Sequence, residues 1–125
     1  MPIQDNSEQT VKSSKYRNVI TEVDGIKFHS KAEARRWQEL KLLERAGAIS
    51  DLCRQTKWPL YGSQANSAMP VKLKHRYVAD FSYFDLQTAK HVVEDVKGFR
   101  TPVYILKAAL FSINYGFSIT EVRVK

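Results

Sequence analysis

Residues 91–98 place an acid and a lysine inside an apolar stretch, and this combination can carry out hydrolytic chemistry. The β-branched residues predict a strand that ends at Gly98. Alternation along a strand puts Asp95 and Lys97 on one face, about 7 Å apart, and turns Glu94 to the other face. An acid and an amine so placed suit a divalent metal beside a hydrolytic water. The alternative, equally favoured by this strand alone, is an ion pair on a half-solvated sheet.

A second acid is expected to face Asp95 across a hairpin. Residues 77–84 alternate aromatic or small side chains with polar ones, which predicts a strand with Asp80 on its polar face. A turn centred in residues 85–90 places Asp80 opposite Asp95. Opposed carboxylates destabilise a sheet unless a cation lies between them or one of them is protonated. The pairing therefore indicates a metal site.

A third acid lies on a predicted helix. Ser30 and Glu33 have the spacing of a capping box, and good helix formers fill residues 31–46. At 100° per residue, Glu33 falls on the inward stripe with Trp37 and Leu40. Two roles stay open for Glu33, because a capping-box glutamate also binds the amide of the cap residue.

The elements around these acids are predicted from turns and caps. Residues 19–28 predict a β-hairpin around Asp24-Gly25, a turn that favours positive φ. Residues 49–61 are expected to be extended, with Pro59 at an edge or an irregular end. Residues 62–76 are expected to form a polar loop.

A second helix is predicted from Thr101-Pro102 to about Tyr115, and residues 117–124 predict a last strand. Tyr104 and Lys107 share a face near the helix start, which can look back toward the end of the Asp95 strand. For both residues a structural role is an equal alternative. Four helix residues are expected in the core: Ile105, Ala108, Ala109 and Phe111.

Composition indicates one basic domain. The 125 residues are enough for one core, with residues 1–14 as a polar arm and residues 15–125 as the domain. The net charge of +7 favours a polyanionic partner such as nucleic acid. The single Cys53 excludes an intrachain disulfide and a zinc-ribbon site, and the three histidines are scattered, so oxygen ligands are expected. We expect a soluble, cytoplasmic protein without a membrane span.

Basic and amide side chains supply candidate contacts to phosphate. Gln55 is a candidate for positioning phosphate or water, with a structural role as the alternative. The candidates for backbone contacts are Lys15, Arg17, Lys72, Lys74 and Arg76. A plain polar terminus and a solvated surface run are the alternatives for these basic residues.

The pattern of Glu33, Asp80 and Asp95-Val96-Lys97 resembles the active site of the PD-(D/E)XK nuclease superfamily. Members carry an acid on the first helix, an acid on the second strand of a meander, and an acid-x-lysine on the third strand. The usual proline before the first strand acid is Ala79 in this chain. The resemblance implies an α/β fold: a restriction-endonuclease-like αβββαβ sandwich with a central mixed sheet, here with an extra N-terminal β-hairpin.

A closer resemblance covers residues 15–122. Residues 30–36, 43–47, 77–81 and 93–98 look like a phage-encoded family of small proteins of unassigned function. Their layout is similar to that of phage Holliday-junction resolvases and of the endonuclease subunit of some transposition systems. The resemblance implies a phage or prophage protein in the cytoplasm of a bacterial host, acting on branched or structured DNA in recombination or replication.

The implied activity is that of a Mg²⁺-dependent DNA endonuclease, with Mn²⁺ as a substitute and no organic cofactor. Asp80, Asp95 and the Val96 carbonyl would hold a cation, and Glu33 a second cation or its water. Lys97 would orient or deprotonate the attacking water. Symmetric cuts across a junction would need two sites, so we expect a homodimer. The alternatives are a non-catalytic nucleic-acid-binding module on the same fold and, less favoured, an RNase.

Overall fold

The fold is described here from a computed structural model, for residues 19–124 of the chain. The expected arm and the candidates Lys15 and Arg17 lie outside these residues. The elements follow in the order β1 (Thr21–Val23), β2 (Ile26–Phe28), α1 (Lys31–Arg45), β3 (Ile49–Tyr61), β4 (Lys72–Asp85), β5 (Lys90–Lys97), α2 (Pro102–Tyr115) and β6 (Thr120–Arg123). The chain forms two compact units, one ending at Glu39 and the other beginning at Leu40.

The first unit holds the predicted hairpin. Strands β1 and β2 pair antiparallel with Glu22 opposite Lys27, as expected. Asp24 and Gly25 form the turn with φ angles of 54° and 77°, the positive values that a two-residue turn needs to match the strand twist. The hairpin prediction is therefore confirmed.

Helix α1 begins and ends where the capping residues predict. The Glu33 backbone N–H donates to Ser30 Oγ at 3.1 Å, which satisfies one of the free amides of the first turn. Beyond the last turn, Gly47 has a φ of 80° and closes the helix in the left-handed conformation. Trp37 and Leu40 are buried, as the inward stripe requires.

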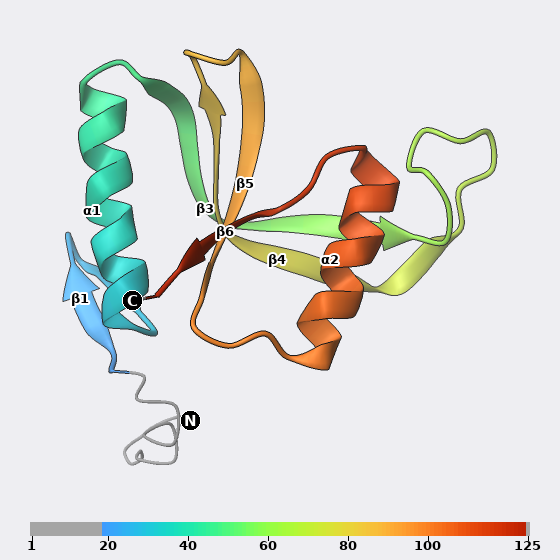
Figure 1. Cartoon of the computed structure of the whole chain (residues 1–125), viewed down its shortest axis with the longest axis horizontal. Helices are drawn as coiled ribbons and strands as arrows, with labels where there is room; N and C mark the ends of the chain where they lie inside the picture. Colours follow the sequence, from blue (N-terminus) through green and yellow to red (C-terminus); the bar gives the residue numbers. More distant parts are fainter. Residues whose placement is uncertain (1–18, 125) are drawn as a thin grey trace. The chain divides into compact units, whose positions relative to one another are not determined.

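The second unit contains a mixed four-stranded sheet in the order β3-β4-β5-β6 (Figure 1). The first three strands form an antiparallel meander, whereas β6 runs parallel to β5. A parallel neighbour needs a crossover connection, which α2 supplies. The α/β class, the mixed sheet and the extra hairpin are confirmed. Strand β3 lies at an edge, as Pro59 predicted.

The loop predicted for residues 62–76 is too long. Strand β4 already begins at Lys72, which pairs with Tyr61 of β3. Pairing with β3 continues through Arg76 opposite Pro59. Leu73 packs against the core cluster while its basic neighbours stay exposed, so tertiary pairing overrides the loop-like composition.

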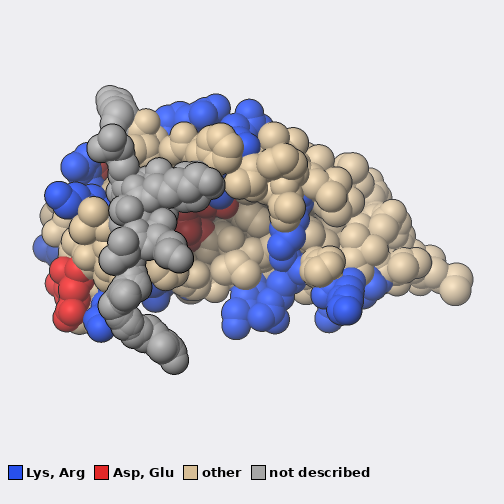
Figure 2. All heavy atoms as spheres, turned by 90° about the horizontal axis from the view of Figure 1, so that it is seen from below, with Lys and Arg blue, Asp and Glu red and all other residues tan. Residues whose placement is uncertain are grey.

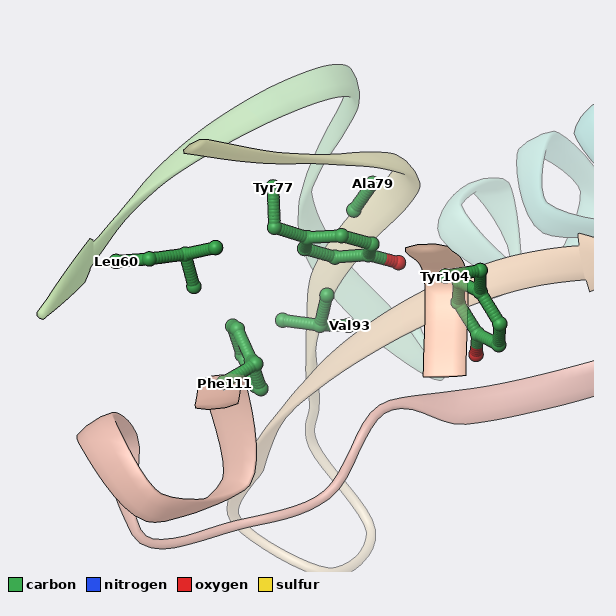
Figure 3. Close-up of a cluster of buried hydrophobic side chains, with 6 residues drawn as sticks. All are labelled: Leu60, Tyr77, Ala79, Val93, Tyr104 and Phe111. Atoms are coloured by element: carbon green, nitrogen blue, oxygen red, sulfur yellow. The ribbon is translucent and has the colours of Figure 1, made fainter. Parts of the chain in front are cut away.

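Helix α2 packs through one narrow stripe onto the sheet. The core cluster consists of Leu60, Tyr77, Ala79, Val93, Tyr104 and Phe111, with Ala108 partly buried beside it (Figure 3). Two of the expected core residues are wrong: Ile105 is 47 % exposed and Ala109 is also exposed. Both lie off the stripe that Tyr104, Ala108 and Phe111 define. Within residues 19–124, no helix has both the length and the apolar character needed to cross a membrane.

Candidate active site

The β4–β5 hairpin brings the two predicted strand acids together. The pairs run from Asp85 opposite Lys90 to Phe81 opposite Glu94, which is the predicted register. The backbone pairs end there. Beyond them, the Asp80 side chain bonds the neighbouring strand, because its Oδ2 accepts the Val96 N–H at 2.8 Å. The side chain of Asp95 is hydrogen-bonded to that of Asp80. The expectation that these two acids meet is therefore confirmed.

Asp95 lies at the centre of this contact and is 5 % exposed. Tyr77 Oη donates to its Oδ2 at 2.6 Å, and Lys97 Nζ lies 3.4 Å from its Oδ1. Burial, followed by the hydrogen bond and charge of Asp80, raises the pKa of Asp95 to about 7. Tyr77 and Lys97 act in the opposite direction without cancelling these effects. Burial and the neighbouring Asp80 therefore both oppose ionisation of Asp95.

A pair of carboxyl groups in contact has the donor chemistry of a site for a hard cation. Carboxylate oxygens are the preferred ligands of Mg²⁺, which commonly takes only one or two of them and keeps several waters. Among residues 19–124, no group of three or more His, Cys, Asp and Glu side chains is gathered for a metal. Among the described residues, the ligands available to a cation at this contact are therefore the oxygens of the Asp80 and Asp95 pair. The Val96 group at this contact is its N–H, so its carbonyl stays a predicted ligand.

Lys97 connects the acids to α2. Its Nζ lies 4.0 Å from the ring centroid of Tyr104, close enough for a cation–π contact. Tyr104 thus faces the end of the Asp95 strand, as its position on the helix predicted. In Figure 3 the hydroxyl of Tyr77 points toward the side of the cluster where Tyr104 lies. Lys107 is half-buried, and none of the described contacts of the acids involves it.

Another acid next to the Asp95 strand, Glu121, is absent from the sequence-based prediction. The parallel register places Glu121 beside Asp95 and Arg123 beside Lys97. Glu121 Oε2 accepts from Tyr104 Oη at 2.9 Å. Burial, then the hydrogen bond and charge of Glu121, raise the pKa of Tyr104. An acid-x-base pattern therefore occurs twice, side by side, on β5 and β6.

Two arginines complete the contacts of Glu121. Arg100 Nε lies 3.3 Å from its Oε2, and Arg123 Nη2 lies 3.6 Å from its Oε1. The arginine side chains are 45 % and 61 % exposed, so each is held at one point and open to solvent elsewhere. Alternation in the Glu-Val-Arg sequence at residues 121–123 puts Glu121 and Arg123 on one face of a strand, which was the available signal. The sequence did not indicate that this strand lies next to β5.

Gln55 has an unusual backbone at the position facing Asp80. The pairs Arg54 with Phe81 and Thr56 with Ala79 flank it, so the register sets Gln55 across from Asp80. Its φ is 56°, a left-handed value that costs a non-glycine residue about 1–2 kcal/mol. Strands β3 and β4 bend in this region (Figure 1). Strain of this kind is concentrated at functional sites, which supports Gln55 as a candidate.

Glu33 belongs to the first unit, whereas Asp80 and Asp95 belong to the second. Its side chain is buried, with the residue 6 % exposed, and its backbone N–H makes the capping bond to Ser30. The Ser30 half of the capping box is therefore confirmed, whereas the bond of the Glu33 carboxylate to the Ser30 amide stays a prediction for Glu33. Its part in the site stays a prediction.

The basic candidates of β4 line a hollow on the sheet. Lys72, Lys74 and Arg76 are exposed, and they line the hollow together with His75 of β4 and Lys57 of β3. On the face drawn in Figure 2, Lys and Arg side chains cover more surface than Asp and Glu side chains. A strand rather than a loop therefore carries this charge, at fixed spacing.

Comparison with known proteins places the chain in one family. No curated protein matches it, and no solved structure does. A model of the family described as "Protein of unknown function (DUF1064)" matches residues 13–124. The match includes every acid and base of the site and nearly the whole chain. The chain therefore belongs to the DUF1064 family.

Proposed function

We propose that this protein is a Mg²⁺-dependent DNA endonuclease with a restriction-endonuclease-like fold. The observation that carries the proposal is the contact of the Asp80 and Asp95 carboxyl groups beside the Val96 amide, with the Lys97 amine 3.4 Å from Asp95. The element order α1, β3, β4, β5, α2, β6 is the order that the nuclease resemblance implies. Acid and lysine then stand at the matching positions of the second and third strands.

The residues divide the work of phosphodiester hydrolysis. Asp80 and Asp95 would bind the cation through carboxylate oxygens, with the Val96 carbonyl as a further candidate ligand. Mg²⁺, or Mn²⁺ in its place, supplies Lewis acidity at the phosphate and makes bound water more acidic. Lys97 orients the attacking water and offsets the charge that develops on the phosphate. Tyr77 holds Oδ2 of Asp95, which fixes the carboxylate so that Oδ1 faces Lys97.

The substrate class follows from charge and from the resemblance. A net charge of +7 and the exposed Lys72, Lys74 and Arg76 support a nucleic-acid backbone as ligand. Arg100 and Arg123, anchored on Glu121, stand next to the acids as phosphate contacts. Branched or structured DNA of phage recombination or replication, in the cytoplasm of a bacterial host, is the substrate that the resemblance favours.

The exposed basic side chains also favour a second candidate, a nucleic-acid-binding module without turnover. Backbone contacts by lysine and arginine do not require a cation. This candidate leaves the contact of Asp80 and Asp95, two acids that repel each other when ionised, without a function. It is therefore ranked second.

One assay separates the two candidates. Supercoiled plasmid, synthetic four-way junctions and structured RNA are each incubated with Mg²⁺, Mn²⁺ or EDTA. We expect metal-dependent cleavage of DNA, lost in Asp95→Asn and Lys97→Ala and kept in Lys90→Ala. Lys90 is the matched control because it is an exposed lysine at the other end of β5.

Each outcome has a clear meaning. Cleavage by Asp95→Asn at the wild-type rate would refute the assigned site. Salt-dependent binding to DNA, without cleavage of any substrate, would favour the binding module. Cleavage confined to RNA would replace the substrate class while keeping the site.

A further inference from the structure

Tyr104 is a core residue whose ring meets a charged amine. It is buried and belongs to the core cluster, at the end away from Leu60 in Figure 3. The centroid of its ring lies 4.0 Å from Nζ of Lys97. An aromatic ring attracts an amine placed over its face, because the π surface is negative. The ring therefore offers a binding surface to the cation of Lys97 in addition to its part in the core.

Two hydrogen bonds fix Tyr104 in this place. Its backbone N–H donates to Thr101 Oγ1 at 3.0 Å, so Tyr104 stands in the capped first turn of α2. Its hydroxyl donates to Glu121 Oε2 at 2.9 Å, on strand β6. Because the backbone and the far end of the side chain are both held, the ring has little freedom to turn away from Lys97.

The amine of Lys97 benefits from a contact other than Asp95. A lysine carries its ammonium group on a flexible four-carbon stem, which leaves the group poorly placed unless neighbours hold it. Nζ lies 3.4 Å from Oδ1 of Asp95, but Asp95 is also a proposed ligand of the cation. A carboxylate whose charge a bound cation offsets attracts an amine less strongly. The ring of Tyr104 is no metal ligand, so its contact with Lys97 does not compete with the cation.

We propose that Tyr104 is the positioning residue of Lys97 and that its ring holds the amine beside Asp95. The inference rests on the proposed function, in which Lys97 orients the attacking water. It gives Tyr104 no contact with substrate, because the hydroxyl is bonded to Glu121. A displacement of about 1 Å in a reacting group can cost about 10²-fold in rate. Loss of the ring should therefore lower kcat and leave KM nearly unchanged.

Nuclear magnetic resonance of the full chain tests the contact without any cleavage. The signal of Lys97 Cε is observed in protein labelled with ¹³C-lysine and is assigned by its loss in Lys97→Arg. Because protons over an aromatic ring are shifted upfield by its ring current, the Hε signal of Lys97 should lie upfield of that of the exposed Lys90. The shift should persist in saturating Mg²⁺ and in Tyr104→Phe, which keeps the ring. It should vanish in Tyr104→Leu.

Tyr115→Leu is the matched control for the loss of a tyrosine. Tyr115 lies on the same helix and packs against the same core cluster, but its hydroxyl donates to the Pro59 carbonyl. This variant should leave the Lys97 signal in place. In cleavage assays, Tyr104→Leu should lower kcat by about 10²-fold. Tyr104→Phe and Tyr115→Leu should each stay within about threefold of the wild-type kcat.

The outcomes separate this proposal from the nuclease proposal. A wild-type Lys97 signal among those of the exposed lysines would overturn it, and this result does not depend on whether Tyr104→Leu folds. So would a shift that Mg²⁺ abolishes, or an equal loss of kcat in Tyr104→Leu and Tyr115→Leu. A shifted signal in a chain that cleaves no substrate would support the contact of Tyr104 with Lys97 and refute the nuclease.

Discussion

Strand β5 carries two neighbouring buried acids that look alike and differ in chemistry. Glu94 is 1 % exposed and Asp95 is 5 % exposed. Each accepts a hydrogen bond from a tyrosine hydroxyl, Glu94 from Tyr83 and Asp95 from Tyr77. Burial and a tyrosine donor are therefore common to both sites.

The difference lies in the other neighbours. Glu94 stands opposite Phe81 in the ladder, whereas Asp95 meets the second carboxyl group of Asp80 and the amine of Lys97. Burial and the second acid raise the pKa of Asp95 to about 7, and a bound cation would relieve the repulsion between the two ionised carboxylates. A buried acid thus becomes a candidate catalytic group through a second carboxyl and an amine, since burial alone does not distinguish the two.

The largest expected effect compares the two acids in catalysis. Asp95→Asn should lower kcat for DNA cleavage by about 10³-fold or more, because it removes an ionisable ligand from the cation site. Glu94→Gln should leave kcat within about threefold, since its side chain faces away from the site. Single-turnover cleavage with saturating Mg²⁺ measures both. Equal losses in the two variants would erase the proposed distinction.

The second prediction concerns stability and pH. The folded-state pKa of Asp95 is raised above the unfolded value, so its protonated form stabilises the fold at low pH. That contribution is fully present below about pH 4 and is lost as pH rises through about 7, a change of up to about 4 kcal/mol. Urea unfolding without divalent cations should therefore show wild-type stability falling over this range. Glu94→Gln should keep this decline.

Asp95→Asn is the decisive control for this pH dependence. The amide does not titrate, so most of the decline should vanish, and the variant should be more stable than the wild type near pH 8. Added Mg²⁺ should raise the stability of the wild type near pH 8 and have little effect on the variant. A decline of the same size in Asp95→Asn would assign it to another group.

A third prediction compares the two tyrosines. Tyr77→Phe and Tyr83→Phe should each cost about 1–3 kcal/mol of stability, because each leaves a buried carboxyl without one donor. Only Tyr77→Phe should also move the acidic midpoint of cleavage to higher pH, since the Tyr77 hydrogen bond lowers the pKa of Asp95. The measurement is a pH–rate profile at subsaturating Mg²⁺. An unchanged midpoint in Tyr77→Phe would show that this bond does not tune the site.

The sequence predicted the parts of this site that depend on local structure. Alternation within β5 fixed the shared face of Asp95 and Lys97, and one short turn fixed the register that brings Asp80 opposite. The position of Tyr104 followed from the cap at Thr101, whose side chain accepts the Tyr104 N–H. Each of these inferences spans only a few residues of chain.

The parts that were missed depend on contacts between distant segments. Glu121 lies beside Asp95 only because β6 joins the sheet parallel to β5. The sequence around Glu121 does not indicate which strand will be its neighbour. The strand at Lys72 forms because β3 pairs with it, against the preference of its own charged residues. The left-handed backbone of Gln55 likewise could not be predicted from the residue type, since such φ angles are rare for residues other than glycine.

The smallest expected effect tests whether the half-buried Glu121 extends the comparison as a third kind of acid. Its Oε atoms hold Arg100 and Arg123 on the strand next to Asp95, where they suit contact with phosphate. Arg123→Gln should raise KM a few-fold with kcat nearly unchanged and reduce the salt dependence of DNA binding by about one phosphate contact. Arg45→Gln, an exposed arginine at the end of α1, is the matched control. If Arg123→Gln lowered kcat and left the salt dependence unchanged, Arg123 would act on the chemical step, and Glu121 would belong with Asp95 instead of forming a separate phosphate anchor.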